Sequence, residues 1–258
     1  MPLAAHFSTS QPDSLAAAIS IPHWKSAGLR YHSYRHFLRR KFGARRVQKV
    51  SLDAGFTCPN VDGTVTTGGC TFCDNRSFSP SRRNRLITAP RRDLAQKILD
   101  QLDDGIRRLK HRYEVDDFIA YFQPATNTYA PVDRLRSVYE AALSHPKVVG
   151  LAIGTRPDCV PNEVLDLLQE LSSRHAPRDE PISRSEMATT TGTYLSLEYG
   201  LQTIHNRSLD WMNRGHHHDA TIDAIERSRG RDFEICGHVI LGLPGETHDD
   251  MLATAREI

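Results

Sequence analysis

The chain has 258 residues, of which 39% are apolar and 25% are charged, and its formal net charge is +2. This length suits one large or two small α/β domains, and no stretch approaches the roughly 20 apolar residues of a membrane span, so we expect no membrane partner. The first thirty residues contain only Lys25 and Arg30 as basic residues and no long apolar run, so we expect neither a transit peptide nor a secretory signal.

The hydrophobic pattern from residue 47 onward predicts strands that alternate with helices. In chain order it predicts strand 49–54, helix 90–110, strand 118–123, helix 132–145, strand 148–154, helix 161–171, strand 194–202, helix 220–229 and strand 233–241. Strands separated by helices form parallel sheets, so we expect an α/β fold of the partial (β/α)6 TIM-like barrel type. In such barrels the chemistry lies at the carboxyl ends of the strands.

The domain boundaries follow from the same pattern. We expect residues 1–30 to be a flexible N-terminal extension and residues 31–258 to be one core domain, in which the polar stretch 174–193 is a surface loop insertion. Asp219 is expected to cap the helix 220–229, and Thr247 the last helix. That helix ends at Ile258, where a barrel would continue, so we expect the chain to be truncated at its C-terminus.

Three of the five cysteines, Cys58, Cys70 and Cys73, lie within 16 residues directly after the first predicted strand. A closed zinc site uses four ligands and an electron-transfer iron–sulfur cube uses four thiolates, so three thiolates leave one metal position open for a substrate or cofactor. The clustering also indicates a reducing compartment rather than a disulfide framework. The glycines between them, Gly63, Gly68 and Gly69, suit a backbone that wraps closely around such a group.

Basic residues flank the cysteine loop on both sides. Two interpretations stay open: a solvated amphipathic helix with long basic side chains, or the approach of an anionic substrate such as RNA. The two clusters are Arg35, Arg39, Arg40, Lys41, Arg45, Arg46 and Lys49, and Arg82, Arg83, Arg85, Arg91 and Arg92.

Seven segments in order make the chain resemble the radical S-adenosylmethionine (radical SAM) superfamily and, within it, the bacterial YhcC/YtqA-like family. The long spacing between Cys58 and Cys70 departs from the commonest superfamily spacing but agrees with this narrower family. The segments run from about Tyr31 to the end of the chain: KVSLDAGFTCPN at 49–60, GCTFC at 69–73, YFQ with TNTYAP at 121–131, GTRPD at 154–158, LEYGLQT at 197–203, NRGH at 213–216 and GHVILGLPGE at 237–246.

The resemblance implies that the three cysteines bind a 4Fe–4S cluster whose fourth iron binds S-adenosylmethionine. It also implies a set of cofactor contacts. Phe72 and the turn containing Gly242 are expected against the adenine, and Gln123 and Asn127 near the methionine amino group, although the usual Gly-Gly-Glu is absent. Thr155, Arg156 and Asp158 are expected at the carboxylate or ribose, and Glu198 and Gln202, which share one strand face, are expected inside the barrel. No residue is assigned as a substrate acid or base.

Other potential ligands are given weaker roles. Cys236 lies within a predicted strand and is expected to be a small buried hydrophobe, Cys159 is a minor candidate for an extra ligand or hydrogen donor, and 216–218 is expected to be a solvated turn. A zinc-stabilised nucleic-acid-binding module without catalysis is the competing class, although no histidine lies between His36 and His111.

The family resemblance points to tRNA wobble-uridine modification in the cytoplasm, with a flavodoxin- or ferredoxin-type one-electron donor. The segment 197–203 also resembles the radical SAM core of elongator-type tRNA-modifying enzymes. A radical SAM enzyme that acts on a small molecule or a peptide is the alternative within the class.

Overall fold

The computed structural model describes residues 23–43, 45–80, 93–115, 117–174 and 192–257. The second basic cluster, most of the N-terminal extension and most of the 174–193 insertion therefore lie outside the described residues. Contacts divide the chain between Leu38 and Arg39 into two units. The small unit holds α1 (His23–Ser26) and the start of α2 (Tyr34–Phe42), in which Tyr34 stacks on Phe37. The large unit holds the remaining elements.

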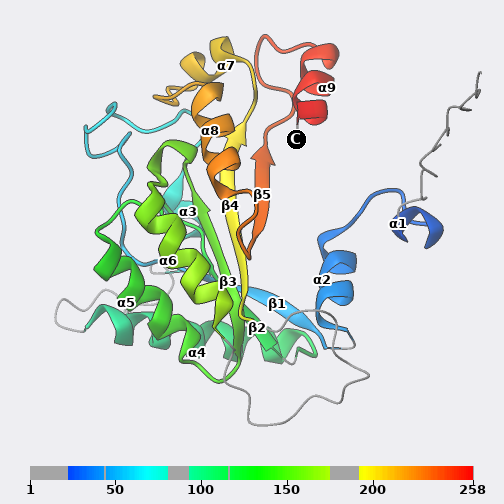
Figure 1. The fold of residues 1–258 in the computed structure, drawn as a ribbon, viewed down its shortest axis with the longest axis vertical. Helices are drawn as coiled ribbons and strands as arrows, with labels where there is room; N and C mark the ends of the chain where they lie inside the picture. Colours follow the sequence, from blue (N-terminus) through cyan, green and yellow to red (C-terminus); the bar gives the residue numbers. More distant parts are fainter. Residues whose placement is uncertain (1–22, 44, 81–92, 116, 175–191, 258) are drawn as a thin grey trace, which may run out of the picture. The chain divides into compact units, whose positions relative to one another are not determined.

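The large unit is built on one parallel sheet of five strands in the order β1-β2-β3-β4-β5 (Figure 1). Each strand pairs with the next one in the sequence, as the alternating pattern predicts, and the α/β fold is therefore confirmed. In the described residues the sheet is open, as in a partial barrel, and contains five strands. They are β1 (Val47–Leu52), β2 (Asp117–Phe122), β3 (Val148–Thr155), β4 (Tyr194–Gln202) and β5 (Glu234–Val239).

Helices α4 (Leu94–Arg112), α5 (Val132–Leu143), α6 (Asn162–Ser173) and α8 (His218–Ser228) connect the strands and pack on one face of the sheet (Figure 1). Their apolar stripes meet the strands in one core, to which Leu52, Ile153 and Leu197 contribute side chains with no exposed surface. The shorter elements are α3 (Asn75–Phe78), η3 (Pro157–Cys159), α7 (Asn206–Trp211) and α9 (His248–Glu257).

The opposite face of the sheet is polar, and we call it the inner face. Successive strand residues point to opposite faces, so Lys49, Tyr121 and Glu198 lie on the face away from the helices when Leu52, Phe122 and Leu197 face the core. His238 of β5 joins them, because it contacts the carboxylate of Glu198. The sheet is therefore apolar on the face toward the helices and charged on the inner face.

The helix ends confirm one predicted cap and correct the other. Thr247 precedes α9, where its hydroxyl accepts from the amide of Asp250 while the Asp250 carboxylate accepts from the amide of Thr247. Helix α8 begins at His218, one residue before Asp219, so the predicted Asp219 cap is wrong. Asp219 instead lies in the first turn, where its negative charge interacts favourably with the positive end of the helix dipole.

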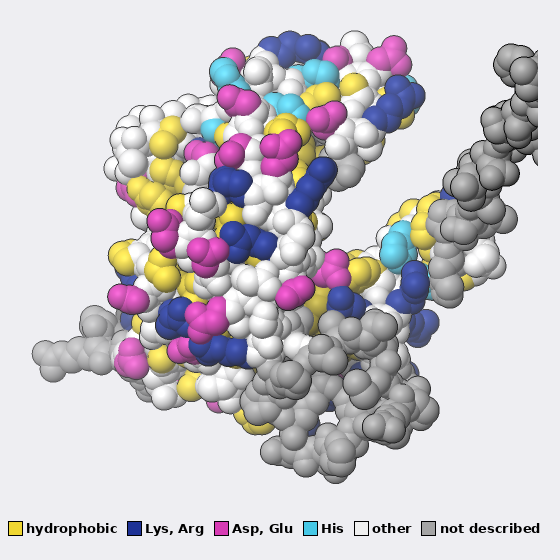
Figure 2. All heavy atoms as spheres, in the orientation of Figure 1, with side chains coloured by type: hydrophobic (Ala, Val, Ile, Leu, Met, Phe, Trp, Pro, Cys, Tyr) yellow, Lys and Arg dark blue, Asp and Glu magenta, His cyan; other side chains and the backbone are white. Residues whose placement is uncertain are grey.

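Charged side chains of both signs are mixed over the helices on the face seen in Figure 2. Many of them pair, as in the two-pronged contact of Arg136 with Glu170 and the contact of Arg231 with Asp166. Within the described parts of the chain, no helix has the length and apolarity to cross a membrane.

Candidate functional site

The cysteine loop leaves β1 and meets the loops that follow β2 and β4 at the carboxyl edge of the sheet. The amide of Thr126, after β2, donates to the carbonyl of Thr57, the residue before Cys58, at 3.2 Å. The amide of Thr71 donates to the carbonyl of Met212, after α7, at 3.0 Å. The loop is therefore held at the edge where parallel α/β folds place their chemistry.

The three cysteine sulfurs lie within electrostatic reach of one another. Cys70 is buried, Cys58 is partly buried and Cys73 is largely exposed, and all three are free thiols. Desolvation of the Cys73 sulfur is the largest factor that raises its thiol pKa, and the neighbouring sulfurs of Cys70 and Cys58 raise it further. The structure therefore brings the Cys73 sulfur near those of Cys58 and Cys70.

In the described ranges, no three His, Cys, Asp or Glu side chains converge closely enough to hold a single metal ion.

A turn between α7 and α8, residues 212–216, clamps the cysteine loop. The side-chain amide of Asn213 donates to the carbonyls of Thr67 and Gly69 at 3.0 and 2.9 Å. In return, the side-chain amide of Asn60 donates to the carbonyls of Asn213 and Arg214 at 2.6 and 2.9 Å. The two asparagines thus fix two segments about 150 residues apart in the sequence.

Gly215 is required by this clamp for two reasons. Its φ is +74°, a conformation that favours glycine, and an added Cβ would come within 2.7 Å of Val65 and 2.8 Å of the Asn60 oxygen. The non-glycine residues with positive φ in the described chain are Ala125, Gln202 and Asn213. Ala125 follows β2, Gln202 ends β4 and Asn213 follows α7, and strain of this kind gathers at functional sites.

Buried polar atoms that lack a hydrogen-bond partner surround the cysteine loop. Five such atoms in the described residues belong to the loop or to the segments against it: Asn60 Oδ1, Thr66 Oγ1, Arg156 Nη1, Arg214 Nε and His216 Nε2. A buried polar atom without a partner is costly, and unsatisfied atoms concentrated at one place indicate a missing polar group. The residues present therefore fit a bound cofactor at this loop.

Arg156 and Asp158 follow β3 and form a two-pronged ion pair, with N–O distances of 2.9 and 2.7 Å. Burial opposes ionisation of Asp158, but the Arg156 hydrogen bonds outweigh it and hold the pKa of Asp158 below its usual value. Arg156 is 2% exposed and keeps its Nη1 free of partners, so it retains one donor for a ligand.

His216 differs from the expected solvated turn. Its side chain is 5% exposed, its Nδ1 contacts the His217 carbonyl at 3.1 Å, and its Nε2 lies 3.8 Å from Asp158. Burial, together with the charge of Arg214, lowers the pKa of His216 to about 4, so the ring is neutral near pH 7. The turn prediction was wrong because the clamp on the cysteine loop draws this residue inward.

The residues predicted after β2 and β3 contact other groups of the protein. The Asn127 amide nitrogen donates to the carbonyls of Phe122 and Gly154 at 3.0 and 2.9 Å. The Gln123 oxygen lies 3.4 Å from the Ser51 hydroxyl, and the hydroxyls of Thr155 and Thr128 lie 2.5 Å apart. Among these three predicted residues, only Asn127 has a buried polar atom, its Oδ1, without a hydrogen-bond partner.

Glu198 lies at the centre of a charged cluster on the inner face. Its carboxylate is 2% exposed and binds the ammonium of Lys49 from β1 and the His238 Nε2 from β5, the latter at 3.0 Å. Burial opposes its ionisation, but the His238 hydrogen bond and the Lys49 charge lower the pKa of Glu198. The Lys49 ammonium also lies 4.3 Å from the centre of the Tyr121 ring.

His238 is the second titratable group of this cluster whose pKa is shifted. The Cys236 thiol, 4.0 Å away, and the Glu198 carboxylate raise the pKa of His238 to about 9. Cys236 is only partly buried and faces the inner face, so the expectation of a buried hydrophobe was wrong. Strand parity places it beside His238, two residues further along β5.

The remaining predicted residues lie at the rim. Phe72 is 42% exposed between Cys70 and Cys73, and Gly242 lies in the exposed turn after β5 with φ +81°. Gln202 ends β4 with its amide folded over Gly200, beside the Arg214 guanidinium. Among the described residues, no hydrogen bond joins Gly242 to the cysteine loop.

Cys159 is buried in η3 next to the site. Its thiol pKa is raised to about 12, first by burial and then by the charge of Asp158, while Cys58 contributes a smaller part. A thiol held protonated in this way is a poor additional metal ligand.

The basic residues before the loop are largely neutralised by the fold. Lys41 pairs with Glu234, Arg45 with Asp117 and Arg46 with Glu114, while Lys49 points to the inner face. The charge that this cluster offers to an anionic partner is thus smaller than its sequence suggests.

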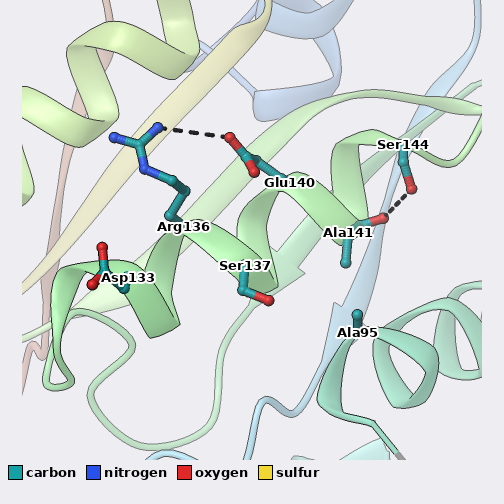
Figure 3. A pocket seen from close by; sticks show the side chains of 7 residues that line it. All are labelled: Ala95, Asp133, Arg136, Ser137, Glu140, Ala141 and Ser144. Atoms are coloured by element: carbon teal, nitrogen blue, oxygen red, sulfur yellow. Dashed lines mark hydrogen bonds and ion pairs between the residues drawn. The ribbon is translucent and has the colours of Figure 1, made fainter.

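Two of the pockets in the described residues lie at different places, one beside the cysteine loop and one on the helix side of the sheet. One, of about 700 Å³, borders the cysteine loop and is lined by residues that include Pro59, Tyr129, Cys159 and Arg227. The other, of about 420 Å³, lies between α4 and α5 on the helix side, where Arg136 points to Glu140 (Figure 3). Arg136 and Glu140 form an ion pair in this pocket.

The chain is similar in sequence to known proteins. Residues 187–258 match the family described as the radical SAM superfamily. The chain is 39% identical to YtqA of Bacillus subtilis over 89% of this chain and 62% of YtqA, and 38% identical to YhcC of Escherichia coli over 86% of this chain and 62% of YhcC. It therefore spans less than two thirds of the length of these relatives.

Two solved structures are also similar. One is the Elp3 of Methanocaldococcus infernus, with a TM-score of 0.47 at 17% identity over 83% of this chain and 42% of that protein. The other is the coproporphyrinogen III oxidase HemN of Escherichia coli, a radical SAM enzyme, with a TM-score of 0.45 at 16% identity over 87% of this chain and 44% of HemN.

Proposed function

Because the chain belongs to the radical SAM superfamily, we propose that it is the catalytic core of a radical SAM enzyme in which Cys58, Cys70 and Cys73 hold a 4Fe–4S cluster. When bound, the cluster and S-adenosylmethionine supply a 5′-deoxyadenosyl radical that abstracts hydrogen from a substrate. The observation that carries the proposal is the group of three free thiols at the carboxyl edge of the sheet, surrounded by unsatisfied buried polar atoms.

The unsatisfied atoms suggest how the chain would hold S-adenosylmethionine. Asn127 uses its amide nitrogen on two backbone carbonyls and leaves its oxygen, an acceptor that suits the methionine amino group. Arg156 leaves one guanidinium donor, which suits the carboxylate or a ribose hydroxyl. Phe72 is exposed beside two of the cysteines, where an aromatic ring can pack on the adenine.

The geometry favours a different role for Glu198 than direct cofactor binding. Its carboxylate already binds Lys49 and His238, so it positions two cationic groups on the inner face. Lys49 and His238 are proton donors there, and we expect the substrate to approach this face. Gln202, Thr155 and Gly242 remain proposed cofactor contacts at the rim.

The enzyme class is tested by product analysis. Anaerobically reconstituted chain, reduced in the presence of S-adenosylmethionine, should release 5′-deoxyadenosine, and the Cys58→Ala variant should release none. A wild-type chain that carries the cluster and yields no 5′-deoxyadenosine contradicts the proposal. A flavodoxin- or ferredoxin-type protein of the cytoplasm is the proposed electron donor.

For the substrate, we infer a tRNA wobble uridine. The support is the similarity of the segment 197–203 to elongator-type tRNA-modifying enzymes and the exposed arginines, Arg39 and Arg40, before the loop. Nucleoside analysis of tRNA from a deletion strain tests this inference. The deletion strain complemented with the wild-type gene and the same strain complemented with the Cys58→Ala gene are the matched controls. A wobble-uridine profile that the deletion leaves unchanged contradicts the inference and favours a small-molecule or peptide substrate.

A further inference from the structure

The sulfur of Cys70 differs from those of Cys58 and Cys73 in its surroundings. The Asn60 side-chain amide lies 3.4 Å from the Cys70 sulfur, and the Arg214 Nη1 lies 3.7 Å from it. Among the described residues, the side-chain contact of the Cys73 sulfur is to an oxygen, Asn75 Oδ1, at 3.5 Å. The two N–H groups of the Asn60 amide have closer acceptors in the carbonyls of Asn213 and Arg214, so the Arg214 guanidinium is the donor that points at the Cys70 sulfur.

Arg214 and Asn60 are each held in place by hydrogen bonds to backbone carbonyls. Arg214 is 5% exposed, and its Nη2 donates to the Gly200 carbonyl in β4 at 2.6 Å. Asn60 is fully buried, and its amide also binds the carbonyls of Asn213 and Arg214. The clamp between the turn 212–216 and the cysteine loop thus aims a buried cation at the Cys70 sulfur.

We propose that Arg214, held in place by Asn60, donates to the Cys70 thiolate and raises the reduction potential of the cluster. The inference rests on the proposed function. Reduction adds a negative charge to the cluster, and a nearby cation that donates to a ligand sulfur stabilises the reduced form more than the oxidised form. The low exposure of Arg214 strengthens this effect, because water screens its charge little.

The test is an EPR-monitored redox titration of the reconstituted full chain and its variants. Arg214→Met removes the charge and the donor, so the equilibrium constant for one-electron reduction should fall about tenfold, a shift of about 59 mV to more negative potential. Arg214→Lys keeps the charge and should shift less. Arg229→Met, at an exposed residue after α8, is the matched control and should leave the potential unchanged.

The outcomes separate this inference from the proposed function. An Arg214→Met protein with a full complement of iron and the wild-type potential overturns the inference. If that variant does not retain its iron, Arg214→Gln decides in its place: a more negative potential supports the inference, and the wild-type potential overturns it. A wild-type chain that takes up no cluster contradicts the proposed function instead.

Discussion

Replacing Glu198 by Gln removes the negative charge that holds the inner-face cluster together. Glu198 is 2% exposed, and its carboxylate binds Lys49 and His238 from the two edge strands of the described sheet. Glutamine keeps the size of the side chain, so the change tests charge rather than packing. It leaves two cations close together without their common anion.

The expected loss follows from the burial of each partner. Removing one member of a buried ion pair costs about 3–5 kcal/mol, because the remaining charge is left without compensation. The Lys49 side chain is 22% exposed and that of His238 is 49% exposed, so water recovers part of this cost. We therefore expect the free energy of unfolding to fall by about 3 kcal/mol at pH 7.

Urea unfolding of the two proteins measures this difference, and NMR titration of His238 gives a second readout. The His238 pKa should fall from about 9 toward its ordinary value of 6.5 in the variant. Lys49→Met and the double variant complete a cycle in which we expect a coupling of about 2 kcal/mol. A stability loss below about 1 kcal/mol with an unchanged His238 pKa would refute the reasoning.

Three further predictions use the same chain. Gly215→Ala should lower the free energy of unfolding by more than about 1 kcal/mol, because the position has a positive φ and the added Cβ would contact Val65. A melting temperature equal to that of the wild-type protein contradicts this prediction. Folding raises the pKa of His238, so its contribution to the free energy of unfolding is fully present below pH 6.5 and is lost as pH rises through about 9. Because solvent screens this side chain, urea unfolding should show that the wild-type protein is less stable at pH 10 than at pH 6 by about 1 kcal/mol, and His238→Gln should abolish this difference. An equal difference in the variant counts against the prediction. Cys159→Ala should retain the wild-type iron content in a colorimetric iron assay, and loss of iron would make Cys159 a ligand.

The strands and their two faces could be predicted from the sequence, because periodicity alone determines them. The alternation in 194–202 places Glu198 and Gln202 on one face, and the three clustered cysteines predict an open metal position. The residues that complete the site could not be predicted in the same way. Lys49 and Glu198 are 149 residues apart, and Arg214 and Cys70 are 144 apart, so only the strand order brings them together.

The basic cluster and His216 show why part of the site could not be predicted. The basic cluster before the loop finds its carboxylates at Glu114, Asp117 and Glu234, which the sequence pattern does not connect to it. His216 was expected in solvent because polar residues surround it in sequence, yet the clamp buries it. In both places long-range contacts outweighed the local pattern.

The central claim is that Cys58, Cys70 and Cys73 together hold a cluster with one iron open to S-adenosylmethionine. The direct measurement is iron content and EPR of the anaerobically reconstituted, reduced chain, before and after S-adenosylmethionine is added. We predict about four irons per chain, an EPR spectrum that changes on addition, and loss of the signal when any one of the three cysteines is replaced by Ala. A chain that holds one zinc, or a four-iron spectrum that S-adenosylmethionine leaves unchanged, would contradict the claim.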